Sequence, residues 1–344
     1  MRTAARDPET GWGLRKRVLF RTAAAALSIV LSLGAFELAA RLWGPAYHRF
    51  ANDTKIYFTN PRGYHDVVGK IGDLPVYGLN YRLTPEGYRL PDDGGTAPAP
   101  AAGAAKRLLF IGDSFTLGMG VRYEDTCVAR LGRMFEAAGR PIAVTNHAVM
   151  GADIENVVDI YSRTVAQQSF DAVVYGFVLN DFGRPMLTGI YGNDFIDFNN
   201  GGNRYDPLRS YSAFYNFVRF RIDRLRLHRV TLRAYLDSFR GPHAAGKFEM
   251  LQRIVTDARA RGMTMIIMVF PLFYDLQNYS FPEAHALIRE YCRAQGLSCL
   301  DLLPLFEPLR AEDLWVNEMD HHPNERAHEM IAGELFKFLG GLGI

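Results

Sequence analysis

Short apolar runs along the chain alternate with longer stretches in which apolar residues recur at helical spacing. The apolar runs lie at 107–111, 142–146, 172–178, 264–270 and 298–303. Runs of this length, bounded by Gly, Asn, Asp or Pro, are typical of buried strands. The periodic stretches predict helices around 125–138, 153–168, 245–261, 283–295 and 324–339. Strands that alternate with helices predict an α/β fold, here a three-layer α/β/α sandwich around a five-stranded parallel sheet.

The longest apolar segment lies near the N-terminus. The 19 residues between Arg21 and Arg41 contain one charged side chain, Glu37. A bilayer is spanned by about 20 apolar residues, so we expect a transmembrane signal-anchor helix over 22–42. The leader, residues 1–21, is basic and favours an N-terminus in the cytoplasm, with the rest of the chain outside it.

Two other interpretations of this segment remain open. A cleaved signal peptide needs a cleavage site of the small-x-small type, and none is convincing before Arg41. A buried core helix fits poorly with so basic a leader. Glu37 lies near the outer end of the segment, where it either reaches the membrane interface or contacts a partner helix.

Composition divides the remaining chain. Residues 43–105 are expected to form a neck and a linker: 45–92 are rich in aromatic residues and glycine, and 93–105 have the Ala/Pro/Gly composition of a flexible linker. We expect the α/β domain over 106–344, with an insertion at about 182–244.

The insertion contains apolar residues at helical spacing, which predict a long helix from Ser210 to Arg240. Four arginines recur every seven residues and therefore share one face of such a helix: Arg219, Arg226, Arg233 and Arg240. Three interpretations of this face remain open, namely a solvated surface, a helix that lies on an anionic membrane, and a groove for an anionic glycan.

Charge and cysteine content exclude some classes of protein. The net charge of +2 argues against a dedicated nucleic-acid binder, which usually shows a clear basic excess. Three cysteines are too few for a disulfide scaffold, although Cys292 and Cys299 could pair if the domain is exported. Cofactor motifs such as GxGxxG after a strand, a Walker loop or HExxH are absent, and no Cys/His cluster suggests a metal, so we expect no cofactor.

Candidate chemistry begins at Phe110-Ile111-Gly112-Asp113-Ser114. Ser114 stands just past the end of a predicted strand, where open α/β sheets bind their ligands. It also stands near the start of a helix, where free N–H groups can hold a developing anion. An ordinary strand-to-helix turn with Asp or Ser as the N-cap is the alternative.

Three further motifs follow at the ends of predicted elements. Gly151 follows the second strand, Asn180 ends the third, and the sequence Asp-His-His-Pro-Asn at 320–324 opens the last helix. With Ser114, the order Ser, Gly, Asn, then Asp with His resembles the SGNH hydrolase superfamily, which is named for four of these residues. The chain is similar in particular to the membrane-anchored bacterial GDSL-type esterases and acyltransferases. The resemblance covers about 106–339 and implies a flavodoxin-like sheet.

The resemblance implies a role for each motif. Ser114 is expected to be the nucleophile, His322 its general base, and Asp320 the acid that orients the imidazole. The oxyanion hole is expected to consist of the Ser114 and Gly151 backbone N–H groups and the Asn180 side-chain amide. A plain turn glycine and a loop-capping asparagine are the alternatives for the last two.

The residues around 320–322 bear directly on the choice of base and acid. His321 is the rival base, but Pro and Asn follow His322 directly, as in the family motif. The usual acid spacing in the family is Asp-x-x-His, whereas position 319 is Met here and Asp320 stands two residues before His322. His328 is expected to be a helix residue without a chemical role.

The resulting functional hypothesis is a serine esterase or O-acyltransferase acting on acyl esters, foremost acetyl esters, of a cell-envelope or secreted polysaccharide. The acyl group would pass through an acyl-serine intermediate to water or to a sugar hydroxyl. A lipid esterase or thioesterase at the membrane surface is one alternative, and a non-catalytic glycan-assembly subunit is another. The expected partners are the acylated carbohydrate, the membrane and a multi-spanning membrane acyltransferase, without nucleic acid. The expected location is the bacterial inner membrane, with one span and a periplasmic catalytic domain.

Overall fold

The computed structural model describes residues 9–43, 58–59, 65–66, 69–70, 80–84, 87–91, 106–182, 208–215, 217–219, 222, 235–317 and 320–344. Contacts divide the chain into two compact units. The first comprises 1–52 and 196–227, and the second comprises 53–195 and 228–344. The neck region from residue 53 onward therefore belongs to the second unit, while part of the insertion belongs with the N-terminal helix.

A five-stranded sheet forms the centre of the second unit. Its strands are β6 (Lys106–Gly112), β7 (Ile142–Ala148), β8 (Ala172–Phe177), β9 (Thr264–Val269) and β10 (Ser298–Asp301). The order is β10-β9-β8-β6-β7, and every neighbouring pair is parallel. The predicted parallel sheet is confirmed, and its order is that of a flavodoxin-like fold. The strand order reverses between β6 and β8, which is where such sheets bind ligands.

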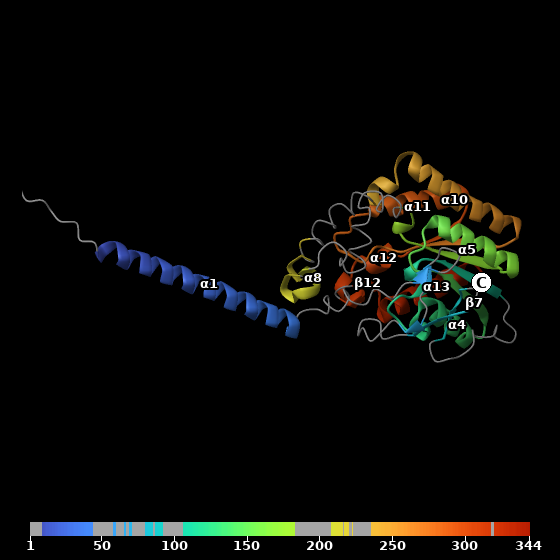
Figure 1. Ribbon diagram of the computed structural model, residues 1–344. Helices are drawn as coiled ribbons and strands as arrows, with labels where there is room; N and C mark the ends of the chain where they lie inside the picture. The colour runs from blue at the N-terminus through green and yellow to red at the C-terminus, as the bar shows by residue number, and fades with distance from the viewer. Residues whose placement is uncertain are drawn as a thin grey trace, which may run out of the picture. The chain divides into compact units, whose positions relative to one another are not determined.

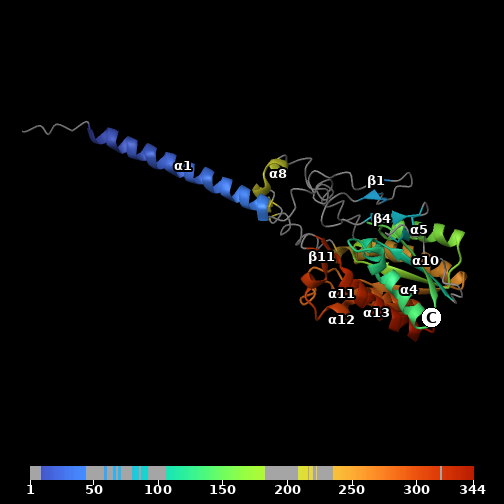
Figure 2. The same cartoon turned by 90° about the horizontal axis from the view of Figure 1, so that it is seen from below.

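Helices cover both faces of this sheet, as the alternating pattern predicts (Figure 1). Their bounds are α4 (Cys127–Ala137), α5 (Ile154–Gln167), α10 (Gly241–Ala260), α11 (Pro282–Gln295) and α13 (Glu325–Gly341). One face is covered by α5, α10 and α11, and the other by α4 and α13, which lie side by side in the turned view (Figure 2). The Phe135 and Phe336 rings pack between these last two helices with centroids 4.8 Å apart.

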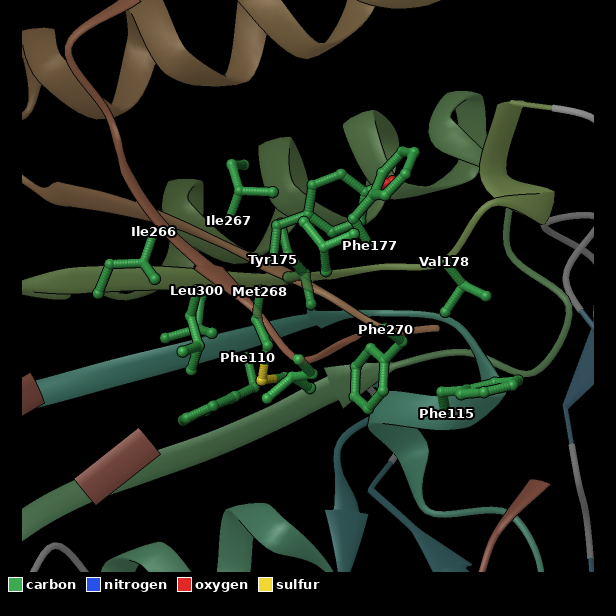
Figure 3. Packing of buried hydrophobic residues seen from close by; sticks show 14 of the residues in the cluster. Phe110, Phe115, Tyr175, Phe177, Val178, Ile266, Ile267, Met268, Phe270 and Leu300 are labelled. Carbon is green, nitrogen blue, oxygen red and sulfur yellow. The ribbon is translucent and has the colours of Figure 1, made fainter. Parts of the chain in front are cut away.

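The hydrophobic core lies on the central strands (Figure 3). The side chains of Phe110, Tyr175 and Ile267 are completely buried, as is Phe270 just beyond β9. Strands buried on both faces have near-continuous apolar sequences, which explains why the strand positions were visible in the amino-acid pattern. The core extends to Phe115, which lies beside Phe270 at the end of the sheet.

Short elements complete the second unit. The small strands are β1 (Phe58–Thr59), β2 (His65–Asp66), β3 (Gly69–Lys70), β4 (Asn80–Leu83), β5 (Arg89–Leu90), β11 (Trp315–Asn317) and β12 (Asp320–Pro323). The short helices are α3 (Ser114–Leu117), η1 (Tyr123–Asp125), α12 (Leu303–Phe306) and η2 (Ala311–Leu314). The first five strands lie in the predicted β-rich neck, and the hairpin of β11 with β12 was not predicted.

The first unit contains α1 (Glu9–Trp43) and α8 (Leu208–Tyr211). Residues Arg15–Leu42 of α1 are long and apolar enough to cross a membrane, with a mean hydropathy of 1.9 in the most apolar window. This observation agrees with the predicted span, and the helix extends further toward the N-terminus than 22–42.

The predicted continuous helix from Ser210 to Arg240 is wrong at both ends. Ser212 is not helical, and its hydroxyl accepts a hydrogen bond from the Tyr215 N–H, as an N-cap does. Arg240 has an extended backbone and precedes Gly241-Pro242, where α10 begins. Gly241 has φ +65°, a conformation that favours glycine, and proline is suited to the first turn of a helix, so this sequence starts a new helix. Of the other arginines in the predicted stripe, Arg226 and Arg233 lie outside the described residues.

Candidate active site

The turn after β6 is built around glycines. Gly112 has φ +150°, and a Cβ there would lie 2.6 Å from the Thr116 hydroxyl oxygen. A Cβ at Gly176 of the neighbouring strand would lie 1.9 Å from the same atom. Both glycines therefore make room for α3 against the strand ends, which brings Ser114 to the edge of the sheet. This explains why a glycine ends the apolar run in the sequence.

Asp113 supports the turn structurally, as the sequence suggested. One carboxylate oxygen accepts a hydrogen bond from the Phe115 N–H at 2.9 Å and caps α3. The other accepts a hydrogen bond from the Asn180 side-chain amide at 3.2 Å. Asp113 thus connects the turn carrying Ser114 to the loop after β8.

Ser114 and His322 form the central pair of the site. The Ser114 hydroxyl oxygen and His322 Nε2 are 2.8 Å apart, although the residues are separated by 208 positions in the chain. Ser114 is the first residue of α3, where a backbone N–H has no acceptor within the helix. A hydroxyl in contact with an imidazole nitrogen, beside such a donor, has the geometry for attack on a carbonyl group.

The hairpin of β11 and β12 decides which histidine faces the serine. Successive side chains of a strand point to opposite sides, so His321 and His322 diverge. His321 stacks on Trp315 with ring centroids 4.0 Å apart and meets Tyr274 edge to face at 5.1 Å. His322 instead lies 5.1 Å from the Phe115 ring. The sequence-based preference for His322 therefore agrees with the geometry.

The predicted oxyanion donors come from adjacent strands. Gly151 has φ +70° in the turn after β7, and the Val149 N–H donates to the Gly112 carbonyl, which joins this turn to the end of β6. Asn180 follows β8 on the other side of β6. Its amide has two hydrogens, and the bond to Asp113 occupies one of them. The second is free to serve another acceptor.

The acid Asp320 begins β12, but its side chain lies outside the described residues. The helix that follows begins as expected, because the Asn324 side chain caps α13 by accepting from the Ala327 N–H at 3.1 Å. The short spacing between Asp320 and His322 falls within a strand rather than a helix. The role of Asp320 therefore stays a prediction.

A second carboxyl group, Asp181, is completely buried behind Asn180. It accepts hydrogen bonds from the Tyr175 hydroxyl at 2.7 Å and from the Val178 N–H at 3.1 Å. Burial, followed by the nearby charge of Asp113, raises its pKa well above the usual range of a carboxyl group. Asp181 thereby fixes the loop that presents Asn180.

His328 is a buried residue of α13, as expected from the sequence. Its Nδ1 accepts a hydrogen bond from the Cys127 N–H at 3.2 Å. Burial, together with the positive charges of Arg89 and Arg130, lowers the pKa of His328 to about 3. A permanently neutral acceptor suits a structural contact better than proton transfer. The three cysteines are free thiols, including Cys292 and Cys299.

Sequence reasoning missed Arg89, which lies in β5 of the neck and is almost fully buried. Its guanidinium donates to the carbonyl oxygens of Leu117 at 2.5 Å, Gly118 at 2.7 Å and Val121 at 2.7 Å. These carbonyls belong to the end of α3 and the loop after it. A planar guanidinium can serve several acceptors at once, so Arg89 holds the segment that follows the serine. The sequence signal was the Gly-x-Arg stretch at Gly87–Arg89, which resembles a stretch that precedes the nucleophile in membrane-anchored bacterial SGNH proteins but indicated no role for the arginine.

We expect Arg89→Met to lower the free energy of unfolding by about 2–4 kcal/mol, because buried carbonyls lose their donor. We also expect kcat on a small ester to fall by about 10–100-fold, since the serine turn loses its support. Arg122→Met is the matched control on an exposed loop and should change neither quantity. Urea unfolding and ester hydrolysis measure the two effects, and an Arg89 variant with unchanged kcat would exclude the positioning role.

The parallel sheet with a Ser–His pair at its switch point is the architecture of a serine ester hydrolase. A comparison with protein families matches residues 110–330, more than half of the chain, to the GDSL-like Lipase/Acylhydrolase family. The chain belongs to this family, in agreement with the SGNH resemblance of its motifs. The comparison with curated proteins gives no significant match.

Several solved structures are similar to this chain at low sequence identity. TesA is 15% identical, with 69% of this chain and 99% of TesA covered, at a TM-score of 0.46. The acetyl xylan esterase AlAXEase is 12% identical. The match covers 67% of this chain and 98% of the esterase, at a TM-score of 0.44. The acetylxylan esterase Axe2 from Geobacillus stearothermophilus is 16% identical. The match covers 69% of this chain and 95% of Axe2, at a TM-score of 0.41. The family assignment rests on the family match.

Proposed function

We propose that the protein is a membrane-anchored serine esterase or O-acyltransferase that acts on short acyl esters of a cell-envelope polysaccharide. The contact of 2.8 Å between the Ser114 hydroxyl and His322 Nε2 carries the chemical part of this proposal. The apolar segment Arg15–Leu42 supports the membrane anchor. Its basic leader favours an extracytoplasmic catalytic unit, which in a bacterium would be periplasmic.

In the proposed mechanism, the Ser114 oxygen attacks the ester carbonyl carbon while His322 Nε2 accepts the hydroxyl proton. Asp320 orients the imidazolium. The oxyanion is held by the backbone N–H groups of Ser114 and Gly151 and by the free amide hydrogen of Asn180. His322 then protonates the departing alcohol oxygen, which leaves an acyl group on Ser114. Water, or a sugar hydroxyl in the transferase reaction, attacks this acyl-serine and restores the free enzyme.

Aromatic packing beside the Ser–His pair supports a short acyl group. Phe115 packs against the His322 ring, and its own ring lies 5.5 Å from Phe270 and 6.2 Å from Phe273. All three phenylalanines are buried. A wall that is already filled by rings leaves little room on this side for a long alkyl chain.

We expect the purified full-length protein to hydrolyse 4-nitrophenyl acetate with a kcat/KM at least about tenfold above that for 4-nitrophenyl octanoate. Acetylated xylan and acetylated alginate, assayed by acetate release with and without a saccharide acceptor, test the polymer and separate hydrolysis from transfer. A preference for octanoate would contradict the short-acyl proposal and favour a lipid esterase. The absence of turnover on every ester would favour a non-catalytic assembly subunit.

A further inference from the structure

Glu37 makes contacts within the first unit that explain a carboxylate in an otherwise apolar helix. Its carboxylate oxygens accept hydrogen bonds from the Ser212 hydroxyl at 2.7 Å, the Ala213 N–H at 2.9 Å and the Phe214 N–H at 3.0 Å. Arg41, one turn further along α1, also donates a hydrogen bond from its Nε to the Glu37 carboxylate at 2.7 Å. A carboxylate near a membrane is tolerated when its hydrogen bonds are satisfied in this way.

These bonds join α1 to the docked segment, by which we mean residues 208–215, 217–219 and 222. The Arg41 guanidinium also donates to the Tyr211 carbonyl at 3.0 Å, and the rings of Phe36 and Phe214 stack with centroids 5.2 Å apart. Both views show α8, the start of the docked segment, beside the C-terminal end of α1 (Figures 1 and 2). The docked segment is therefore attached by charge, backbone and ring contacts at one level of α1.

The level of attachment follows from helix geometry. Glu37 stands five residues before Leu42, where the apolar span ends. At 1.5 Å per residue this distance is about 7.5 Å along the helix. Amphipathic segments that lie in a membrane interface bury their apolar face about 5–10 Å below the surface, so Glu37 holds the docked segment at the depth of the interface.

Among the described side chains of the docked segment, the exposed ones are apolar or aromatic. Tyr211 is 77% exposed, Leu208 57%, Ile222 38% and Val218 36%. The neighbouring residues of α1 are also exposed and apolar, with Phe36 at 56%. The two apolar surfaces are adjacent because the Phe36 and Phe214 rings are in contact, so the same apolar environment can cover both.

We propose that the docked segment is a second membrane-binding element, which lies in the interface of the lipid bilayer on the side where α1 ends. The inference rests on the proposed membrane anchoring of α1. The chain passes between the two units at 52–53, at 195–196 and at 227–228. Membrane binding by the docked segment therefore holds the catalytic unit to the bilayer through three covalent connections rather than one, which suits an enzyme whose polymeric substrate lies close to the membrane.

The test places an environment-sensitive fluorophore on one introduced cysteine at a time in the full-length protein, in phosphatidylcholine vesicles. The background carries Cys299→Ser, and the two thiols that remain, Cys127 and Cys292, are buried. Val218→Cys reports on the docked segment, Leu31→Cys on the span, and Glu249→Cys on an exposed position of α10. Vesicles with spin labels on the lipid acyl chain, near the headgroup or near the chain end, act as quenchers. We expect the label at 218 to be quenched most strongly by the shallow spin label, the label at 31 by the deep one, and the label at 249 by neither.

Each outcome has one meaning. Quenching at 31 without quenching at 218 overturns the inference but leaves the proposed anchor intact. A label at 218 that is shielded from water yet unquenched by lipid also overturns it, and indicates a protein partner. Loss of quenching at 31 overturns both proposals. Glu37→Ala should lower quenching at 218 toward the level of the 249 control without changing quenching at 31. Ser32→Ala, on the same helix, is the control and should change neither. Unchanged quenching at 218 in Glu37→Ala would exclude Glu37 as the attachment.

Discussion

Ser114→Ala is expected to reduce ester hydrolysis by about 10⁴-fold or more, because the reaction loses its nucleophile. The change removes one hydroxyl oxygen and leaves α3, its cap at Asp113 and the aromatic packing at Phe115 in place. The free energy of unfolding should therefore change by less than about 1 kcal/mol. Initial rates on 4-nitrophenyl acetate and urea unfolding measure the two quantities.

Ser162→Ala is the matched control for this experiment. Ser162 is an exposed residue of α5 whose hydroxyl donates to the Val158 carbonyl in its own helix. The same atom is lost there, but no effect on the rate is expected. Mass spectrometry of the wild type, quenched during turnover, should find the acyl group on the peptide that contains Ser114. A Ser114→Ala protein that retains more than a few per cent of the activity would exclude this serine as the nucleophile.

The central fold was predictable because parallel strands that are buried on both faces have continuous runs of apolar residues in the sequence. The run before Gly112 is apolar at every position that the core needs, and its neighbour at 172–178 follows the same rule, whereas the edge strand at 142–146 is only partly buried and includes Thr145 and Asn146. The order of the site motifs was visible for a related reason. Ser114, Gly151 and Asn180 each follow a strand, and adjacent parallel strands bring such residues to one edge.

Contacts between residues that are far apart in the chain have no such local pattern in the sequence. The three carbonyls bound by Arg89 lie 28–32 residues away in the chain, and a single arginine in a glycine-containing stretch does not identify them. Glu37 and Ser212 are 175 residues apart. Their contact also explains why the predicted insertion helix is interrupted, since the break at Ser212 lets the Ser212 hydroxyl and the N–H groups of Ala213 and Phe214 donate to Glu37. Helical periodicity in the sequence contains no information about such a break.

The hairpin of β11 and β12 was missed because its strands are only 3 and 4 residues long. So short a pair is defined by its register and by packing, here of Trp315 on His321, rather than by an alternating apolar pattern. The hairpin matters for the site because it gives two consecutive histidines opposite directions. A sequence motif could rank His321 and His322, but the strand determines which imidazole meets the serine.

His322→Ala is therefore expected to be as damaging as Ser114→Ala, and the double variant no worse than either single one. Residues that act as a unit lose their joint effect when one of them is removed, so their losses are not additive. His321→Ala provides the comparison at the adjacent position. Its ring packs between Trp315 and Tyr274, so we expect a lower free energy of unfolding, by about 1–2 kcal/mol, with kcat reduced less than about tenfold.

The outcome of these two changes distinguishes the two imidazoles as general base. A larger loss of kcat in His321→Ala than in His322→Ala would contradict the assignment and the contact of 2.8 Å on which it rests. Additive losses in the Ser114/His322 double variant would show that the two side chains act in separate steps. With the expected pattern, the hydroxyl of Ser114 and Nε2 of His322 form one proton-transfer unit. The alternation of side chains along β12 orients the His322 ring toward the serine.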